Sequence, residues 1–260
     1  MLIVISPAKS LDYETPVRTR RFTQPDFLTE SEQLIGTLRG MSAQDLSTLM
    51  SISPTLGKLN HERFRDWQLP FDTDNARQAL FAFKGDVYLG LEAQTFEASD
   101  VTYAQHHLRI LSGLYGLLRP LDLIQPYRLE MGTRLSTERG KSLYEFWGSR
   151  ITDALNAELE QQRSRVLINL ASNEYFKAVR NKELAGDVIN PVFKDYKGGQ
   201  YKLISFFAKR ARGLMSAYII RNRIDNPRDL PSFDTDGYRY SEKESTPASP
   251  VFLRRVGDRT

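Results

Sequence analysis

The sequence predicts a single-domain α+β fold with a mixed sheet and many helices. Short apolar runs near both ends of the chain are typical of buried strands, whereas most of the sequence between them has apolar residues at helical spacing. No internal repeat, coiled-coil pattern or linker divides the 260 residues, so one domain is expected over residues 1–260. In this arrangement the sheet is completed only by strands near the C-terminal end of the chain.

The first half of the chain predicts one strand followed by helices. Residues 2–5, Leu-Ile-Val-Ile, form an apolar run that predicts a buried strand, and Ser6-Pro7 ends it. Pro25 can occupy the first turn of a helix, and Ser42 can cap the next one. The predicted helices are residues 25–38, a helix after Ser42 that carries Leu46, Leu49 and Met50, and residues 54–67 and 74–83. Residues 84–88 predict a turn into a short extended segment.

Residues 100–130 contain a two-glycine turn between two apolar runs that are predicted to be helical, the first of them capped by Ser99 or Asp100. Such a turn leaves backbone N–H groups unpaired at the start of the second helix, where the helix dipole also favours an anion such as phosphate. The segment therefore predicts a helix–hairpin–helix that binds a nucleic-acid backbone. Its contacts are the turn residues Gly113, Leu114, Tyr115 and Gly116 and the nearby Arg109, Arg119 and Arg128. The alternative is an ordinary helical hairpin whose glycines only end a helix.

The second half predicts a long helix over residues 142–161, a buried strand over 165–170 and a basic hairpin–helix segment over 187–223. In this segment residues 187–194 and 201–207 flank Lys197-Gly-Gly-Gln200 as strands of a β-hairpin, with Pro191 at an edge or bulge. A basic helix then spans residues 208–223. Residues 231–250 predict an irregular loop, and residues 251–253 predict a final strand.

Positive charge is concentrated in one part of the chain. The formal net charge is only +4, but residues 175–223 hold eleven Lys and Arg against three Asp and Glu, a local charge of +8, so the remainder carries −4. This distribution is typical of a surface that binds phosphates, although a solvated face has the same composition. The predicted phosphate contacts are Lys177, Lys194, Lys202, Lys209, Arg210 and Arg212. Tyrosines among these charges can stack on bases or support the sheet.

Several classes of chemistry are absent from the sequence. It has no cysteine, which excludes disulfides, thiolate nucleophiles and thiol peroxide sensing. Phosphate-binding P-loop, dinucleotide-binding and serine-hydrolase motifs are missing, and the three histidines have no metal-ligand spacing. We therefore predict no metal and no cofactor, and favour a binding protein over an enzyme. No apolar run approaches the roughly 18 residues of a membrane span, so the prediction is a cytoplasmic protein without a membrane partner.

The polar loop after the first strand is a separate candidate site. Lys9 can bind phosphate as a point charge, or act as an amine nucleophile with Asp12 or Asp86 as acid or base. The alternative is a solvated lysine after a strand end.

Six segments of the chain resemble the YaaA family of bacterial peroxide-stress proteins. They span residues 5–12, 83–88, 111–122, 125–132, 169–176 and 208–215, and the resemblance covers essentially the whole length. It implies an α+β fold with a helix–hairpin–helix, a positively charged cleft and DNA binding. It also implies a role in limiting oxidative damage by keeping unincorporated iron low during peroxide stress. Two residues separate Gly113 from Gly116, whereas the usual helix–hairpin–helix turn has one residue between its glycines.

The leading hypothesis is a DNA-binding protein that contacts double-stranded or structured DNA without sequence specificity, with a monomer favoured. The first alternative is an enzyme that processes nucleic acids or nucleotides, with a base-excision-like mechanism at Lys9. The second is a protein-binding or metal-homeostasis factor whose basic face meets an acidic partner.

Overall fold

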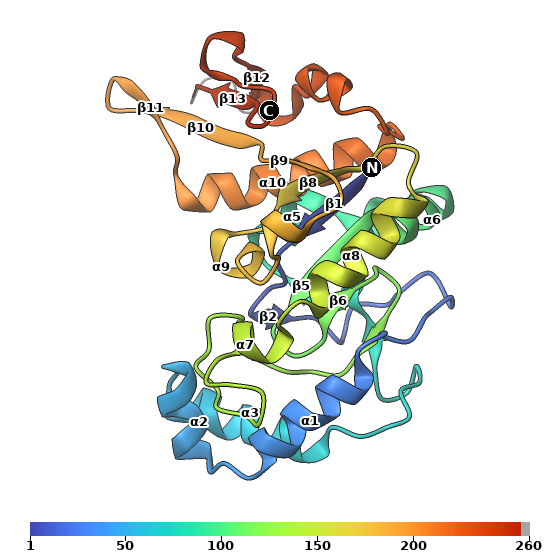
Figure 1. Ribbon diagram of the computed structural model, residues 1–260, viewed down its shortest axis with the longest axis vertical. Coiled ribbons are helices and arrows are strands. Elements are labelled where there is room, and N and C mark those ends of the chain that lie inside the picture. Colours follow the sequence, from blue (N-terminus) through green and yellow to red (C-terminus); the bar gives the residue numbers. More distant parts are fainter. Residues whose placement is uncertain (256–260) are drawn as a thin grey trace.

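The computed structural model describes residues 1–255 and has the predicted α+β fold. Helices α1 (Leu28–Arg39), α2 (Ala43–Met50) and α3 (Pro54–Asp66) lie at one end of the molecule, and the strands β10 to β13 lie at the other (Figure 1). A five-stranded sheet lies between them. Within residues 1–255, none of the helices combines the length and the apolar composition needed to cross a membrane.

The strand β1 (Leu2–Ile5) forms the centre of the five-stranded sheet, whose order is β6-β5-β1-β8-β9. It pairs in parallel with β5 (Leu108–Ser112) on one side and with β8 (Val166–Leu170) on the other. The strand β9 (Asp187–Ile189) continues the parallel pairing, and β6 (Gly116–Leu118) runs antiparallel to β5. All four residues of β1 are fully buried, which confirms the predicted core strand.

The second sheet has the order β11-β10-β13-β12 and is built from the C-terminal part of the chain. The strands β10 (Val192–Lys197) and β11 (Gln200–Lys202) form an antiparallel hairpin. The strand β13 (Val251–Arg254) pairs in parallel with β10 and antiparallel with β12 (Arg239–Tyr240). Two smaller antiparallel pairs join β2 (Ser10–Leu11) to β4 (Phe83–Lys84) and β3 (Arg77–Gln78) to β7 (Leu123–Ile124).

The remaining helices connect and cover the sheets. They are α4 (Ala79–Ala82), α5 (Asp86–Leu91), α6 (Ala98–His107), α7 (Leu143–Trp147), α8 (Arg150–Gln161), α9 (Asn173–Phe176) and α10 (Ser205–Arg221). Short 3₁₀ helices span Ala93–Thr95, Asn181–Glu183, Pro227–Ser232, Thr235–Gly237 and Glu242–Glu244.

The backbones of α5 and α10 touch where the two helices cross, because each helix has a glycine at the crossing. A Cβ atom at Gly213 would lie 1.8 Å from the carbonyl oxygen of Val87, and one at Gly90 would lie 2.2 Å from that of Arg210. A side chain at either position would therefore push the helices apart. The helix α10 also packs against β1, β8 and β10, so this crossing fixes α5 relative to both larger sheets.

The predicted helix–hairpin–helix at residues 100–130 is wrong. The helix α6 ends at His107, and the next residues form β5, the two-glycine turn and β6. Residues 108–112 are all buried between β1 and β6, so strand pairing with distant residues overrides the local helical pattern. Leu114 and Tyr115 are fully buried, and the carbonyl oxygen of Gly113 accepts a hydrogen bond from Trp147 Nε1 at 3.0 Å. The turn is part of the core and presents no open anion site.

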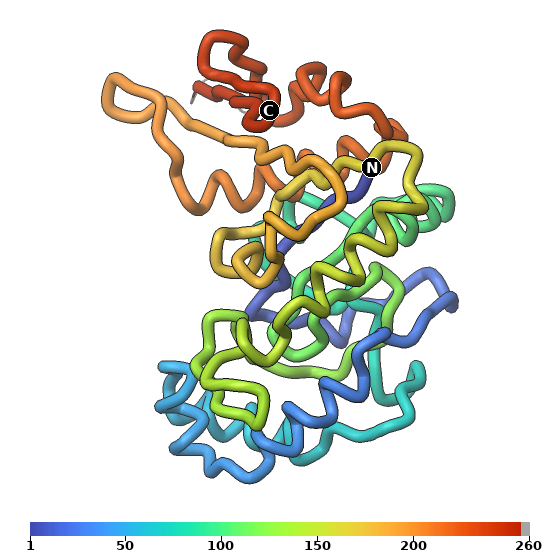
Figure 2. Tube along the Cα trace, in the orientation of Figure 1, coloured from blue at the N-terminus to red at the C-terminus, as the bar shows by residue number. Residues whose placement is uncertain are grey.

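Other element boundaries also differ from the prediction. Of residues 74–83 only α4 is helical, and residues 86–91 form the helix α5 instead of an extended segment. Gly148, with φ of +55°, divides the predicted long helix into α7 and α8. Residues 205–207 begin α10 rather than ending a strand. Pro191 separates β9 from β10, which belong to different sheets, and the β10–β11 hairpin projects from the body (Figure 2).

The burial of the two-glycine turn gives a first prediction. Gly116 has φ of +67°, and a Cβ atom there would lie 2.7 Å from the Trp147 ring. We expect Gly116→Ala to lower the free energy of unfolding by about 2–4 kcal/mol, because it adds backbone strain and overpacking. Urea denaturation measures this change.

Gly199→Ala is the matched control, because Gly199 also has a positive φ, of +82°, but nothing lies near its Cβ position. It should cost only about 1–2 kcal/mol of backbone strain. Equal losses in the two variants would contradict the core position of the turn.

Candidate functional site

A pocket of about 290 Å³ lies at the carboxyl ends of β1 and β8. Loops that follow adjacent parallel strands meet at this edge of a sheet, which is where ligands bind in many α/β proteins. We call it the strand-end pocket. It is lined by residues 6–10 and 84–88 and by Glu130, Ser172, Glu174, Tyr175, Lys209 and Arg212.

Hydrogen bonds between the two strand-end loops hold the floor of the pocket. The backbone N–H of Ser172 donates to Ser6 Oγ at 2.9 Å, and the two serine hydroxyls are 3.3 Å apart. The hydroxyl of Tyr88, from α5, donates to the carbonyl oxygen of Ser6 at 3.2 Å. Because β1 and β8 are paired in parallel, these bonds extend the register of the sheet into the loops.

Lys9 is held by a carboxylate that is distant in the sequence. Its Nζ lies 3.1 Å from Glu130 Oε1, which also lies 2.9 Å from Arg128 Nη2. The other oxygen, Glu130 Oε2, is buried without a hydrogen-bond partner. This ion pair places the Lys9 amine beside Glu130 at the pocket.

Asp12, the predicted acid or base, has a different role. It accepts hydrogen bonds from the backbone N–H groups of Glu14 and Thr15 and from the Thr15 hydroxyl, and Lys84 Nζ lies 3.7 Å away. These contacts, with the backbone bond from Thr15 largest, lower the pKa of Asp12 to about 2. A carboxylate that stays ionised in a turn is a poor proton donor near neutral pH. Asp86, the other predicted acid or base, lines the pocket.

The helix α10 adds two cations to the pocket wall. Lys209 is exposed, whereas Arg212 is partly buried, and burial lowers the pKa of its guanidinium group. Neither side chain takes part in the ion pairs found within residues 1–255. A desolvated cation without a carboxylate partner favours an anionic ligand.

The pocket brings some of the predicted site residues together. Lys9, Asp86, Lys209 and Arg212 line it, and Arg128 is linked to it through Glu130. Lys177 lies close by, since its Nζ is 4.8 Å from the centre of the Tyr144 ring, and the Tyr144 hydroxyl donates to the carbonyl oxygen of Glu174.

Other predicted phosphate contacts lie elsewhere. Arg109 is buried, and its Nε donates to Glu158 at 2.7 Å. Arg119 pairs with Asp26 and Asp122, and Lys194 pairs with Glu244 at 2.6 Å. Lys202 is on β11, and Arg210 is exposed on α10 outside the pocket lining. Of the predicted contacts in residues 187–223, Lys209 and Arg212 line the strand-end pocket and Lys194, Lys202 and Arg210 do not.

A helical hairpin is present in another part of the chain. Ser51, Ile52 and Ser53 join α2 to α3, with Ser51 in the left-handed conformation and Ser53 Oγ accepting a hydrogen bond from the N–H of Leu56. The two helices pack closely, since a Cβ atom at Gly57 would lie 2.0 Å from Ser47 Oγ. The turn residues Ser51 and Ser53 and the following Thr55 are exposed.

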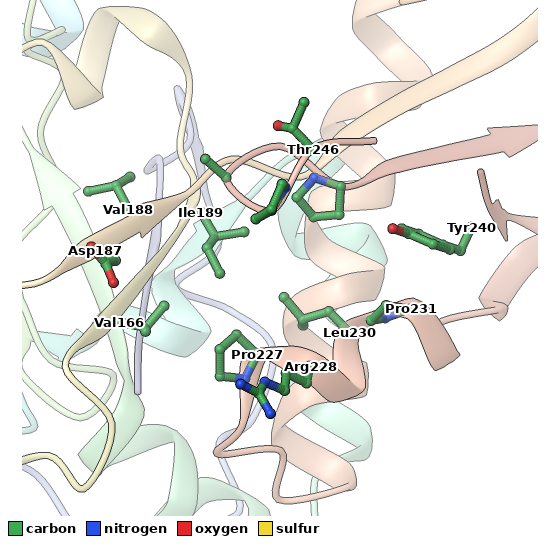
Figure 3. Close-up of a pocket in the computed structure, with 13 residues that line it drawn as sticks. Val166, Asp187, Val188, Ile189, Pro227, Arg228, Leu230, Pro231, Tyr240 and Thr246 are labelled. Atoms are coloured by element: carbon green, nitrogen blue, oxygen red, sulfur yellow. The ribbon is translucent and has the colours of Figure 1, made fainter. Parts of the chain in front are cut away.

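A second pocket, of about 510 Å³, lies between β9 and the C-terminal loops (Figure 3). Its lining is mostly apolar, with Val166, Ile189 and Leu230 from three different elements and Asp187 and Arg228 as its charged residues. None of the predicted site residues lines it. It is therefore a weaker candidate than the strand-end pocket.

Lys84 and Glu130 line the pocket although the sequence did not single them out as site residues. The signal that points to them is the set of segments that carries the family resemblance, because every residue lining the strand-end pocket lies in five of those six segments. The sixth, residues 111–122, contains the buried turn. Within residues 1–255, no group of three or more His, Cys, Asp or Glu side chains is placed to hold a metal ion.

Comparison with known proteins gives matches along nearly the whole chain. A family model described as peroxide stress protein YaaA matches residues 1–244. A UPF0246 protein of Aliivibrio fischeri (strain ATCC 700601 / ES114) is 59% identical over 254 residues, which cover 98% of each chain. A UPF0246 protein of Cellvibrio japonicus (strain Ueda107) is 60% identical over 254 residues, with the same coverage. One of Burkholderia multivorans (strain ATCC 17616 / 249) is 57% identical over 260 residues, covering 99% of this chain and all of the relative.

The lowered pKa of Asp12 predicts a pH-dependent contribution to stability. Because the folded pKa, about 2, lies below the ordinary value of 3.8, ionised Asp12 stabilises the fold above about pH 4, and this contribution is lost as the pH falls toward 2. We expect Asp12→Asn to lower the free energy of unfolding at pH 7, and the difference from wild type to shrink near pH 2. Urea denaturation at both pH values measures it.

Asp74→Asn is the control, since Asp74 is exposed and its carboxylate has none of these contacts. A stability difference for Asp12→Asn that does not change with pH would show that the turn, and not the charge, is responsible.

Proposed function

The chain belongs to the peroxide stress protein YaaA family, and from that premise we propose that it acts in the peroxide stress response by binding DNA at the strand-end pocket. The observation that carries the proposal is the convergence of Lys9, Lys84 and the α10 pair Lys209 and Arg212, from three distant segments, at one pocket. Phosphates of a DNA backbone are the natural ligands of such a group of cations.

The exposure of these cations suits a backbone contact. The side chains of Lys9 and Lys84 are 66% and 63% exposed although each lies near a carboxylate, so a phosphate can reach them without displacing the fold. Lysine acts here as a flexible point charge, and the arginine adds a planar group that can bind a phosphate through two N–H bonds. Contacts to phosphates alone carry no sequence information, so backbone binding of this kind would be without sequence specificity.

We also propose that the helical hairpin of α2 and α3, and not residues 113–116, supplies the helix–hairpin–helix contact that the family resemblance implies. The first turn of α3 is exposed, and Lys58 lies one turn further along the same helix on the surface. A helix N-terminus with a nearby cation stabilises a phosphate. Lys58→Ala is expected to weaken DNA binding, as is also expected of the variants at the pocket.

We further propose that the iron-limiting role implied by the resemblance is a cellular consequence of this protein's activity. We assign it no metal ligands among residues 1–255. Free iron damages DNA through its reaction with peroxide, so DNA binding and low iron would protect the same molecule.

Salt dependence tests the DNA-binding proposal. Each neutralised phosphate releases counterions, so affinity for duplex DNA should fall steeply with salt, with a slope of about −0.9 per phosphate contact in a plot of log affinity against log salt. We expect Lys209→Ala to make this slope shallower by about 0.9 and to weaken binding uniformly across sequences. Fluorescence anisotropy with duplex DNA at several salt concentrations measures both.

Lys243→Ala is the control, because Lys243 is exposed on the 3₁₀ helix Glu242–Glu244 and lies outside the strand-end pocket. An affinity for duplex DNA that is indifferent to salt, or equal effects of Lys209→Ala and Lys243→Ala, would overturn the proposal.

The enzymatic alternative makes a separate prediction at Lys9. The ion pair with Glu130 occupies the Lys9 amine, so we expect Lys9 not to form a Schiff base readily. We expect borohydride to trap no adduct at Lys9 with DNA that contains an abasic site. An adduct that forms with wild type and disappears in Lys9→Arg would establish Lys9 as a nucleophile and support the alternative.

A further inference from the structure

The lining of the strand-end pocket contains both signs of charge, which a bare phosphate backbone does not require. Lys9, Lys84, Lys209 and Arg212 line it together with Asp86, Glu130 and Glu174. Carboxylates repel a polyanion at close range, and they accept hydrogen bonds from amines and hydroxyls. The lining therefore fits a ligand that has one anionic group and several hydrogen-bond donors.

The charged residues of the pocket come from different elements. Lys209 and Arg212 lie one turn apart on α10, without carboxylate partners among the ion pairs of residues 1–255. Glu130 follows β7 on a different segment, where Lys9 and Arg128 neutralise it. Glu174, on α9, accepts a hydrogen bond from the N–H of Gly132 at 3.0 Å. The helix α10 thus offers positive charge without an ion-pair partner, and the segments of Glu130 and Glu174 offer carboxylates that are held in place.

The size and the aromatic lining limit the ligand further. A volume of about 290 Å³ is at the lower end of the range for small-molecule pockets, roughly 300–1,000 Å³, so one small molecule or one unit of a polymer fills it. Tyr88 and Tyr175 are both buried and both line the pocket, and Tyr88 is fixed by its bond to Ser6. Aromatic side chains beside hydrogen-bonding groups are typical of sites that hold a nucleobase.

We propose that the strand-end pocket binds a single nucleotide that ends in a phosphomonoester, with Lys209 and Arg212 on the phosphate and the carboxylates of Glu130 and Asp86 accepting hydrogen bonds from the sugar or base. This inference rests on the proposed DNA-binding function, because a nucleotide is the unit of that ligand. The same chemistry is found in a free deoxynucleoside monophosphate and in the phosphorylated end of a DNA strand.

Calorimetric titration of the whole protein with deoxyadenosine monophosphate, deoxyadenosine and inorganic phosphate tests the site. We expect saturable binding of the monophosphate and at least tenfold weaker binding of the nucleoside, which lacks the charge. Arg212→Met should weaken monophosphate binding about tenfold or more, as expected for losing a charged hydrogen bond. Lys209→Ala, at an exposed position, repeats the test if Arg212→Met does not fold.

Arg239→Met is the matched control, because Arg239 is exposed on β12 and lies outside this pocket. Glu130→Gln separates recognition from a structural role. It replaces a carboxylate acceptor by a neutral amide and so removes a negative charge, which should weaken monophosphate binding while strengthening the binding of inorganic phosphate. A change of both affinities in the same direction would overturn the assigned role of Glu130.

Single-stranded oligonucleotides with and without a 5′-phosphate distinguish the two sources. Tighter binding of the phosphorylated oligonucleotide, lost in Arg212→Met, assigns the pocket to DNA ends, whereas binding of the monophosphate alone assigns it to free nucleotides. If neither gains from the phosphate, the inference is overturned. If salt-dependent duplex binding persists in that case, the proposed function stands. If duplex binding is absent while nucleotide binding is retained, the proposed function alone is overturned.

Discussion

The parallel pairing of β1 with strands on both sides is the constraint on which the rest of the structure depends. Its four residues are fully buried, and they align β5 and β8, which come from residues more than one hundred positions away. Because the three strands run in the same direction, the loops after β1 and β8 leave the sheet at one edge. The bond from the Ser172 N–H to Ser6 Oγ then fixes the floor of the strand-end pocket.

The parts of the fold that local patterns determine could be predicted from the sequence. The strand β1, the capping of α2 by Ser42 and the start of α3 at Pro54 each have a clear signal in the neighbouring sequence. The helical prediction for residues 108–118 is wrong because their apolar pattern suits a buried helix and a buried strand equally. The choice between them is made by β1, which is a distant partner. Periodicity alone predicts one helix over residues 142–161, whereas Gly148, with its positive φ, ends α7.

The candidate site also has parts with local signals and parts that depend on distant residues. Lys9, Lys209 and Arg212 were predicted because a polar loop after a core strand and a basic helix are local signals. The partner of Lys9 could not be predicted, since Glu130 is 121 residues away and nearby Asp12 is an equally plausible carboxylate. Asp12 instead caps its own turn through Thr15, a local contact that its spacing permits but does not require. The total charge of residues 175–223 does not indicate which of these cations line the pocket, because that depends on how α10 packs in the fold; among the predicted contacts of this stretch, Lys209 and Arg212 line it.

The backbone contact between α5 and α10 has a consequence for how this site can change. Gly90 and Gly213 leave no side chain between the helices, so main-chain atoms, and not adjustable rotamers, set the distance from Val87 and Tyr88 to Lys209 and Arg212. Substitutions of the lining can alter the charge and shape of the pocket while its width stays the same. The pocket can therefore take a different lining without any change in the helix crossing that frames it.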